Sequence, residues 1–176
     1  IIILVATMSA WIMALLLQLK PVDFIRISLP VELWIVFRFL ASFCGVFGFS
    51  IMFNSPIRLA SASALIGAVA NTLRLELVDL AGMPPAAAAF IGALTAGLFA
   101  SMIKNKAGYP RISLTVPSIV IMVPGLYLYR GFYNLGIMSL STAASWFAAA
   151  ILIIAALPLG LIFARILTDR TFRYCT

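Results

Sequence analysis

Apolar residues form six long runs along the chain, and short polar connectors separate them. The runs cover Ile1–Leu19, Leu33–Phe53, Leu59–Leu77, Pro85–Ile103, Thr115–Tyr133 and Thr142–Leu167. Each holds about 19 residues or more, which as a helix is long enough to cross roughly 30 Å of hydrocarbon. The pattern therefore predicts an all-α protein, a polytopic membrane bundle of about six transmembrane helices.

Composition and charge support a membrane protein. Hydrophobic residues make up 64% of the 176 residues and charged residues 10%, whereas a soluble domain has about 45–50% and 25%. The net charge of +7 would also suit a nucleic-acid partner. Lys and Arg, however, lie mostly between apolar runs and at the C-terminus, as topology signals do. We therefore expect the lipid bilayer as a partner and no nucleic acid.

The basic residues also indicate an orientation. They gather after the second run, between the fourth and fifth runs, and at the end of the chain: Arg58; Lys104, Lys106 and Arg111; Arg165, Arg170 and Arg173. In an alternation of six spans, all three places fall on one side, which the positive-inside rule makes cytoplasmic. We expect a multi-pass protein of the inner or plasma membrane with both termini in the cytoplasm.

The third run carries a polar stripe. Ser63, Gly67, Asn71 and Arg74 recur at helical spacing on one face. An amide and a guanidinium are costly against lipid, so this face should meet protein or water, where such groups mark a pathway or an interhelical pair. Arg74 has two other interpretations: it snorkels to the headgroups from the end of the run, or it forms a structural ion pair.

The fourth run is rich in small residues. Two adjacent rows at a spacing of four consist only of alanine and glycine: Ala88, Gly92 and Ala96; Ala89, Ala93 and Gly97. Small residues at this spacing let helix backbones approach closely. We expect this helix to lie at the centre of the bundle, in a packing role.

The fifth run contains helix breakers. Pro117 and Pro124 each lack a backbone N–H, and the ring of Pro124 crowds the carbonyl of Val120. In hydrocarbon, a freed carbonyl needs a partner, so a broken helix persists where protein or a wet cavity surrounds it. Gly125 adds backbone freedom and room for close approach. A helix broken near residues 117–125 is expected, and the break serves either packing or a substrate site.

One further charge lies toward the end of the fifth run. Tyr129 and other tyrosines surround Arg130, as in an interfacial aromatic belt with a snorkelling cation. The functional alternative is that Arg74 and Arg130 present guanidinium groups to a carboxylate in transit, since their fork of donors matches its two oxygens.

The connector between the second and third runs reads as a tight turn. Asn54 is suited to cap the following helix, Pro56 to sit in its first turn, and Arg58 to anchor it on the basic side. The chain has no histidine and no Gly-rich phosphate loop ending in Gly-Lys-Ser/Thr. We expect no metal, no cofactor and no enzymatic activity.

Three motifs, in this order and spacing, give the chain a resemblance to a known family. They are the Phe-Asn-x-Pro-x-Arg turn at 53–58, Gly67-Ala68 with Arg74 seven residues after Gly67, and Pro117 with the later Pro124-Gly125 and Tyr129. Over roughly 33–167, the chain resembles the five-span C-terminal half of the threonine/serine exporter family, which also occurs as the small subunit of two-gene members.

The resemblance implies a function and an organisation. It implies a secondary exporter of small amino acids or carboxylates, threonine, serine or succinate among them, that works with a partner subunit or a fused N-terminal half in an oligomer. Residues 1–32 would be a first helix and connector, 33–170 the five-helix exporter domain and 171–176 a cytoplasmic tail. The polar stripe and the helix break would line the substrate pathway. The alternative function is a non-transporting scaffold or assembly subunit.

Overall fold

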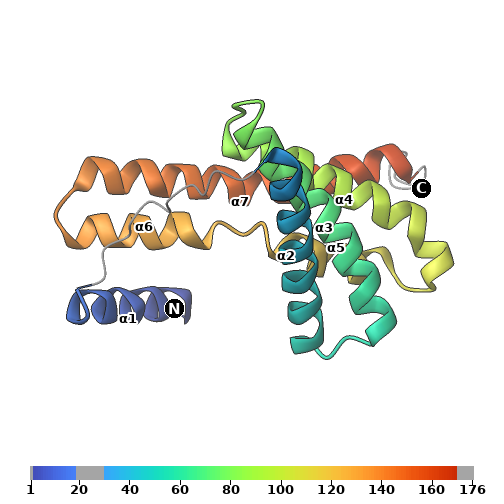
Figure 1. Cartoon of the computed structure of the whole chain (residues 1–176), viewed down its shortest axis with the longest axis horizontal. Helices are drawn as coiled ribbons and strands as arrows, with labels where there is room; N and C mark the ends of the chain where they lie inside the picture. The colour runs from blue at the N-terminus through green and yellow to red at the C-terminus, as the bar shows by residue number, and fades with distance from the viewer. Residues whose placement is uncertain (1, 19–29, 170–176) are drawn as a thin grey trace. The chain divides into compact units, whose positions relative to one another are not determined.

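The structure, a computed structural model, describes residues 2–18 and 30–169 (Figure 1). These residues hold seven helices and no strand, which confirms the all-α prediction: α1 Ile2–Leu16, α2 Val31–Met52, α3 Ile57–Asp79, α4 Pro85–Ala107, α5 Arg111–Val120, α6 Gly125–Gly136 and α7 Leu140–Thr168. The predicted tail at 171–176, with Arg170 before it, and most of the first connector lie outside the described residues.

Prolines fix where the helices start. Five consecutive helices, α2 to α6, each follow a proline at the N-cap position: Pro30, Pro56, Pro84, Pro110 and Pro124. The missing N–H costs nothing there, because the first N–H groups of a helix have no partner inside the helix. The chain therefore marks helix starts with proline rather than with capping side chains.

The predicted helical membrane bundle is confirmed, and its helices differ in how well they suit hydrocarbon. Among the described residues, α2, α4 and α7 are long and apolar enough to cross a membrane, and α5 with α6 is a fourth candidate if the two form one interrupted span. Helix α1 has 15 described residues, and α3 carries the polar stripe, so neither qualifies. The count of six spans stays a prediction.

The predicted break in the fifth run is confirmed. Helix α5 continues through Pro117 and ends at Val120, and α6 begins at Gly125 after Pro124. The Val120 carbonyl accepts a hydrogen bond from the Val123 N–H at 3.2 Å. A tighter turn thus satisfies the carbonyl that Pro124 leaves without its helical donor.

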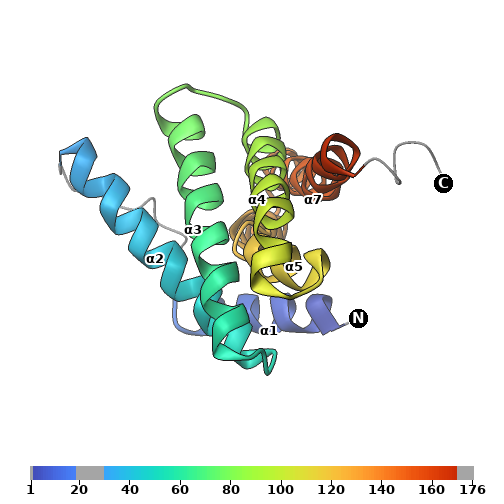
Figure 2. The ribbon, with the colours of Figure 1, turned by 90° about the vertical axis from the view of Figure 1, so that its right-hand side faces the viewer.

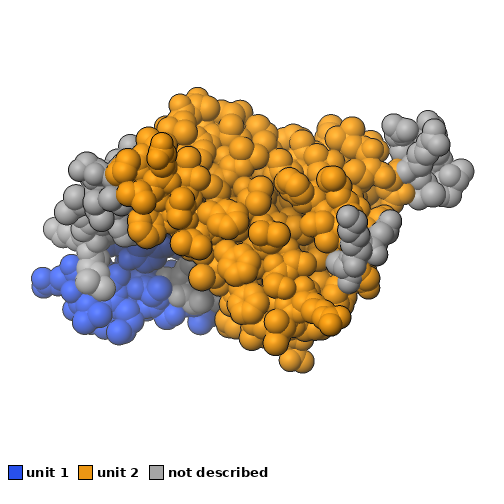
Figure 3. All heavy atoms as spheres, turned by 45° about the vertical axis from the view of Figure 1, so that its right-hand side comes forward, with its two compact units in different colours: residues 1–28, 124–152 blue, residues 29–123, 153–176 orange. Residues whose placement is uncertain are grey.

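The chain divides into two compact units, which Figure 3 distinguishes by colour. The first unit is Ile1–Ser28 with Pro124–Leu152, and the second is Leu29–Val123 with Ile153–Thr176. In the first unit, α1 packs against α6. Trp11 of α1 lies so close to Gly136 of α6 that a Cβ there would be 2.1 Å from the indole ring. Phe132 meets Phe147 edge to face, with ring centroids 5.1 Å apart.

The second unit is built around α3, which contacts α2, α4 and α5; Figure 2 shows it between α2 and α4. The predicted central position of α4 is confirmed, because both of its alanine and glycine rows are buried. Gly160 of α7 lies against the other side of α4, where an added Cβ would be 2.5 Å from the Phe90 carbonyl oxygen. Small residues therefore set the helix spacing in this unit.

Candidate functional site

The polar stripe of α3 faces protein, as the spacing of its residues predicts. Ser63 is fully buried, Asn71 is 4% exposed and Gly67 is buried as well. Arg74, at the end of the stripe, is half-buried. The stripe is the face that α3 turns toward α2 and α5, and it brings Ser63, Gly67, Asn71 and Arg74 together in the second unit.

Gly67 is the point of closest approach. A Cβ at this position would be 2.7 Å from Val46 Cγ2 of α2 and 2.8 Å from the Ser118 carbonyl oxygen of α5. Only glycine leaves room for both neighbours. The three helices therefore meet at the middle of the stripe.

Polar side chains from all three helices surround this contact. The Asn71 amide donates to Ser42 Oγ of α2 at 2.8 Å, and Ser118 Oγ of α5 donates to the Ser63 carbonyl at 3.0 Å. Ser42 and Ser118 are themselves buried. The sequence analysis missed them; the signal for Ser42 was its spacing of four from Val46 and eight from Ser50, which are buried on the same face of α2.

Three buried side-chain oxygens of α3 are not hydrogen-bonded within the described ranges of the chain. Ser63 Oγ, Asn71 Oδ1 and Thr72 Oγ1 are buried and lack a hydrogen-bond partner among the described residues. Buried polar atoms are almost always hydrogen-bonded to protein or water. The cluster of α2, α3 and α5 therefore offers unused acceptors and hydroxyl groups inside an otherwise apolar bundle.

Arg74 connects the stripe to the helix break. Its Nη1 lies 3.4 Å from the Met122 carbonyl oxygen, in the segment between α5 and α6. The Arg74 Cβ packs against Gly92 of α4, since a Cβ added to that glycine would be 3.2 Å from the Arg74 Cβ. A side chain of α3, rather than lipid, therefore meets the irregular backbone, as expected for broken helix in a membrane.

Of the other residues predicted to line the pathway, Pro124, Gly125, Tyr129 and Arg130 belong to the first unit and Pro117 to the second. Arg130 of α6 stacks over the Trp146 ring, with its guanidinium carbon 4.9 Å from the ring centroid, and Tyr129 lies 6.5 Å from Tyr133 between ring centroids. A cation over an indole face is attracted by the negative face of the ring. The close approach expected at Gly125 is wrong, since an added Cβ would find nothing within 4 Å.

A comparison with known families decides what kind of protein this bundle is. The family model described as Threonine/Serine exporter, ThrE, matches residues 38–167. The chain belongs to the threonine/serine exporter family. This family is one of transport proteins, not of enzymes. No curated protein and no solved structure gives a significant match.

The turn that contributes to the exporter resemblance differs in detail from its predicted geometry. Asn54 does not cap α3; it adopts a positive φ of 56°, which asparagine tolerates better than most residues. Pro56 sits at the N-cap position, one residue before the first turn of α3. Arg58 is exposed at the start of α3. The motif therefore encodes a tight helical hairpin in this chain.

The sequence analysis missed an ion-pair cluster on the α2–α3 hairpin. Arg38 of α2 binds Glu76 Oε1 at 2.8 Å and also Asp79 Oδ2, and it lies over the Trp34 ring. A single cation from the preceding helix therefore holds both carboxylates of α3. The available signal was Arg38 itself, since a lone arginine in an apolar run requires a partner.

We expect Arg38→Ala to destabilise the α2–α3 hairpin. Arg38 and Glu76 are 20% and 16% exposed, so removing the guanidinium leaves a half-buried carboxylate without its partner, at a cost of about 1–2 kcal/mol after solvent screening. The measurement is thermal unfolding of the purified chain in detergent. Arg58→Ala removes an exposed arginine from the same hairpin and serves as the control; equal unfolding temperatures for the two variants would contradict the role given to Arg38.

Proposed function

We propose that the chain is a secondary-transport subunit that exports small amino acids or small carboxylates, threonine, serine or succinate in type. The proposal rests chiefly on one observation: the α3 stripe buries polar atoms that have no hydrogen-bond partner in the described part of the chain, Ser63 Oγ and Asn71 Oδ1 among them. In a bundle this apolar, polar groups facing inward are typical of a substrate pathway. We assign Ser63, Gly67, Asn71 and Arg74 to that pathway.

The chemistry of the stripe suits such a substrate. A small amino acid presents a carboxylate, an ammonium group and, in threonine or serine, a hydroxyl group. The guanidinium of Arg74 can donate to the carboxylate through two parallel bonds. Asn71 Oδ1 and Ser63 Oγ are acceptors for ammonium or hydroxyl protons.

The helix break and α6 complete the proposed pathway. A discontinuous helix near a substrate site exposes backbone groups that can bind polar substrates. We assign Pro117, Pro124 and Gly125 to this role as the residues that interrupt the helix. Tyr129 and Arg130 are proposed to contact substrate from α6, with Arg130 exchanging its Trp146 contact for a carboxylate.

A second membrane half is part of the proposal. The chain would work with a partner subunit or a fused N-terminal half, in an oligomer of the cell membrane with both of its own termini in the cytoplasm. The alternative is a scaffold subunit that stabilises a partner without contacting substrate. The small residues between α4 and its neighbours α3 and α7 favour this alternative, because close helix packing explains them without any contact to substrate.

The test is an efflux assay on cells loaded with labelled threonine, serine or succinate, with the chain expressed beside its partner half. We expect Asn71→Leu to slow efflux about two- to tenfold, because a neutral hydrogen bond contributes about 0.5–1.5 kcal/mol. Asn134→Leu is the matched control, since the Asn134 amide donates to the Arg130 carbonyl of its own helix. Full efflux by Asn71→Leu at normal membrane levels would favour the scaffold.

A further inference from the structure

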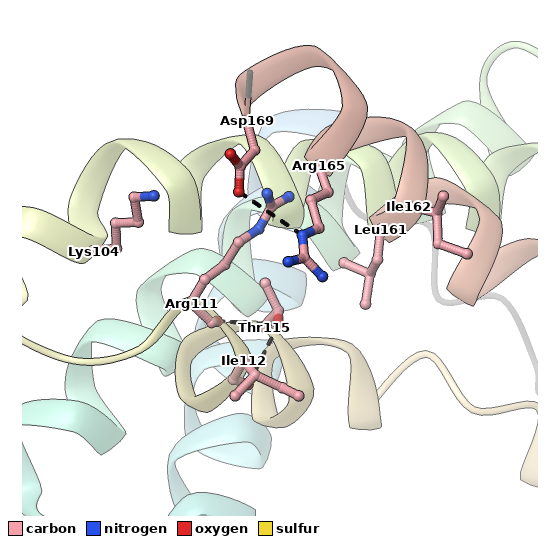
Figure 4. Close-up of a pocket in the computed structure, with 8 residues that line it drawn as sticks. All are labelled: Lys104, Arg111, Ile112, Thr115, Leu161, Ile162, Arg165 and Asp169. Atoms are coloured by element: carbon pink, nitrogen blue, oxygen red, sulfur yellow. Dashed lines mark hydrogen bonds and ion pairs between the residues drawn. The ribbon is translucent and has the colours of Figure 1, made fainter. Parts of the chain in front are cut away.

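A second polar feature lies apart from the stripe, where the ends of three helices meet in the second unit. A pocket of about 330 Å³ opens between the last turns of α4 and α7 and the first turn of α5. Its lining combines three basic residues, one acidic residue and exposed apolar side chains: Lys104, Arg111 and Arg165; Asp169; Ile112 and Ile162. Figure 4 shows the side chains of Arg111, Arg165 and Asp169 converging.

Arg111 is held in place by the other two helices. Its Nη1 donates to Thr168 Oγ1 of α7 at 3.1 Å. Its Nη2 packs against Gly97 of α4, since a Cβ added to that glycine would be only 3.1 Å from the nitrogen. That nitrogen is buried and has no hydrogen-bond partner within the described parts of the chain. The guanidinium is thus held between α4 and α7, and its charge lies in the lining of the pocket, where an anion can meet it.

The charge balance of the pocket is positive. Three cations line it against one carboxylate, and Asp169 Oδ2 lies 3.9 Å from Arg165 Nε. The Asp169 carboxylate offsets part of the charge of both Arg165 and Arg111, and the three cations still outnumber it in the lining. Like charges gathered at one place repel, and a bound anion relieves that repulsion.

The rim of the pocket is apolar. Ile112 is 68% exposed and Ile162 is 45% exposed, in a protein whose exposed apolar surface is suited to hydrocarbon. A small dissolved anion makes no favourable contact with apolar side chains at the rim, whereas a phospholipid places a charged phosphate directly beside its acyl chains. The basic pocket with an apolar rim at helix ends therefore matches a lipid molecule better than a dissolved ion.

We propose that this pocket binds the phosphate headgroup of an anionic phospholipid. Arg111 and Arg165 contact the phosphate oxygens, Lys104 adds a third positive charge, and the acyl chains lie over Ile112 and Ile162. The proposal needs only that the chain is embedded in a membrane, and it does not depend on the proposed transport function. The positive-inside rule would place the site in the cytoplasmic leaflet.

Native mass spectrometry of the full chain in detergent tests the proposal, with phosphatidylglycerol and phosphatidylcholine as probes. We expect phosphatidylglycerol to bind at least about tenfold more tightly, because each basic residue near the surface adds attraction for anionic lipid. Lys104→Gln combined with Arg165→Gln should remove most of that preference. Arg58→Gln, which removes an exposed arginine outside the pocket, should leave it unchanged.

Three results would overturn the assignment. Equal binding of the two lipids would exclude a headgroup site. An equal loss of preference in Arg58→Gln would mean that overall charge, not the pocket, selects the lipid. Displacement of phosphatidylglycerol by inorganic phosphate at millimolar concentration would assign the pocket to a dissolved anion. If the double variant fails to fold, Lys104→Gln alone still decides the question, because Lys104 takes no part in the contacts that hold Arg111.

Discussion

Arg74→Ala is expected to slow substrate efflux about tenfold to hundredfold. In the proposed pathway, the guanidinium binds the substrate carboxylate and lies beside the Met122 carbonyl at the helix break. A hydrogen bond to a charged group contributes about 1.5–3 kcal/mol, which corresponds to that range of rates. The measurement is the initial rate of labelled threonine and succinate efflux from loaded cells or vesicles, normalised to the amount of protein in the membrane.

Two further arginine variants make this result specific. Arg74→Lys keeps the charge and loses the fork, so it should recover part of the efflux. Arg130→Ala should have a smaller effect than Arg74→Ala, because in the structure Arg130 stacks on Trp146. Unchanged efflux in both alanine variants, at normal membrane levels, would remove the arginines from the pathway and support a scaffold role.

Gly67→Leu is expected to cause the largest loss of stability. Its Cβ would lie 2.7 Å from Val46 and 2.8 Å from the Ser118 carbonyl oxygen, so α3 would have to move away from both α2 and α5. Overpacking of this kind costs about 3 kcal/mol. The measurement is the thermal unfolding temperature of the purified chain in detergent, together with its level in the membrane.

Gly48→Leu is the matched control for this substitution. Gly48 also lies inside a helix, α2, and an added Cβ there would find nothing within 4 Å. The same change of side chain should therefore leave the unfolding temperature nearly unchanged, or raise it, since leucine favours helix more than glycine does. A similar loss in both variants would show that Gly67 does not govern the helix contact.

Periodicity and proline positions predicted the parts of the structure that depend on neighbours along the chain. Helical spacing alone placed Ser63, Gly67 and Asn71 on one buried face, and Pro124 located the break in the fifth run. These features are local, because the geometry of one helix determines which residues share a face and where its hydrogen bonds fail. The same reasoning identified the central packing of α4 from its small residues.

Contacts between distant helices could not be predicted in this way. Nothing within α2 indicates that Arg38 pairs with Glu76 and Asp79, and nothing within α6 indicates that Arg130 stacks on Trp146. The Arg111 pocket likewise requires three helix ends to meet. Such pairs depend on how helices pack, which the period of one helix does not encode. The predictions for the cap at Asn54 and for the close approach at Gly125 failed for a local reason. Asparagine can cap a helix or adopt a positive φ, and glycine can allow close packing or backbone freedom, so the residue type alone does not decide between them.

The contact between Arg74 and the Met122 carbonyl has a consequence for how the helix break can respond to its surroundings. An arginine keeps its proton across the whole physiological range of pH, and a backbone carbonyl does not titrate there. A change in acidity therefore leaves this contact intact, whereas a bound carboxylate competes for the same guanidinium. In the proposed pathway, the segment between α5 and α6 therefore responds to an anionic substrate rather than to a proton.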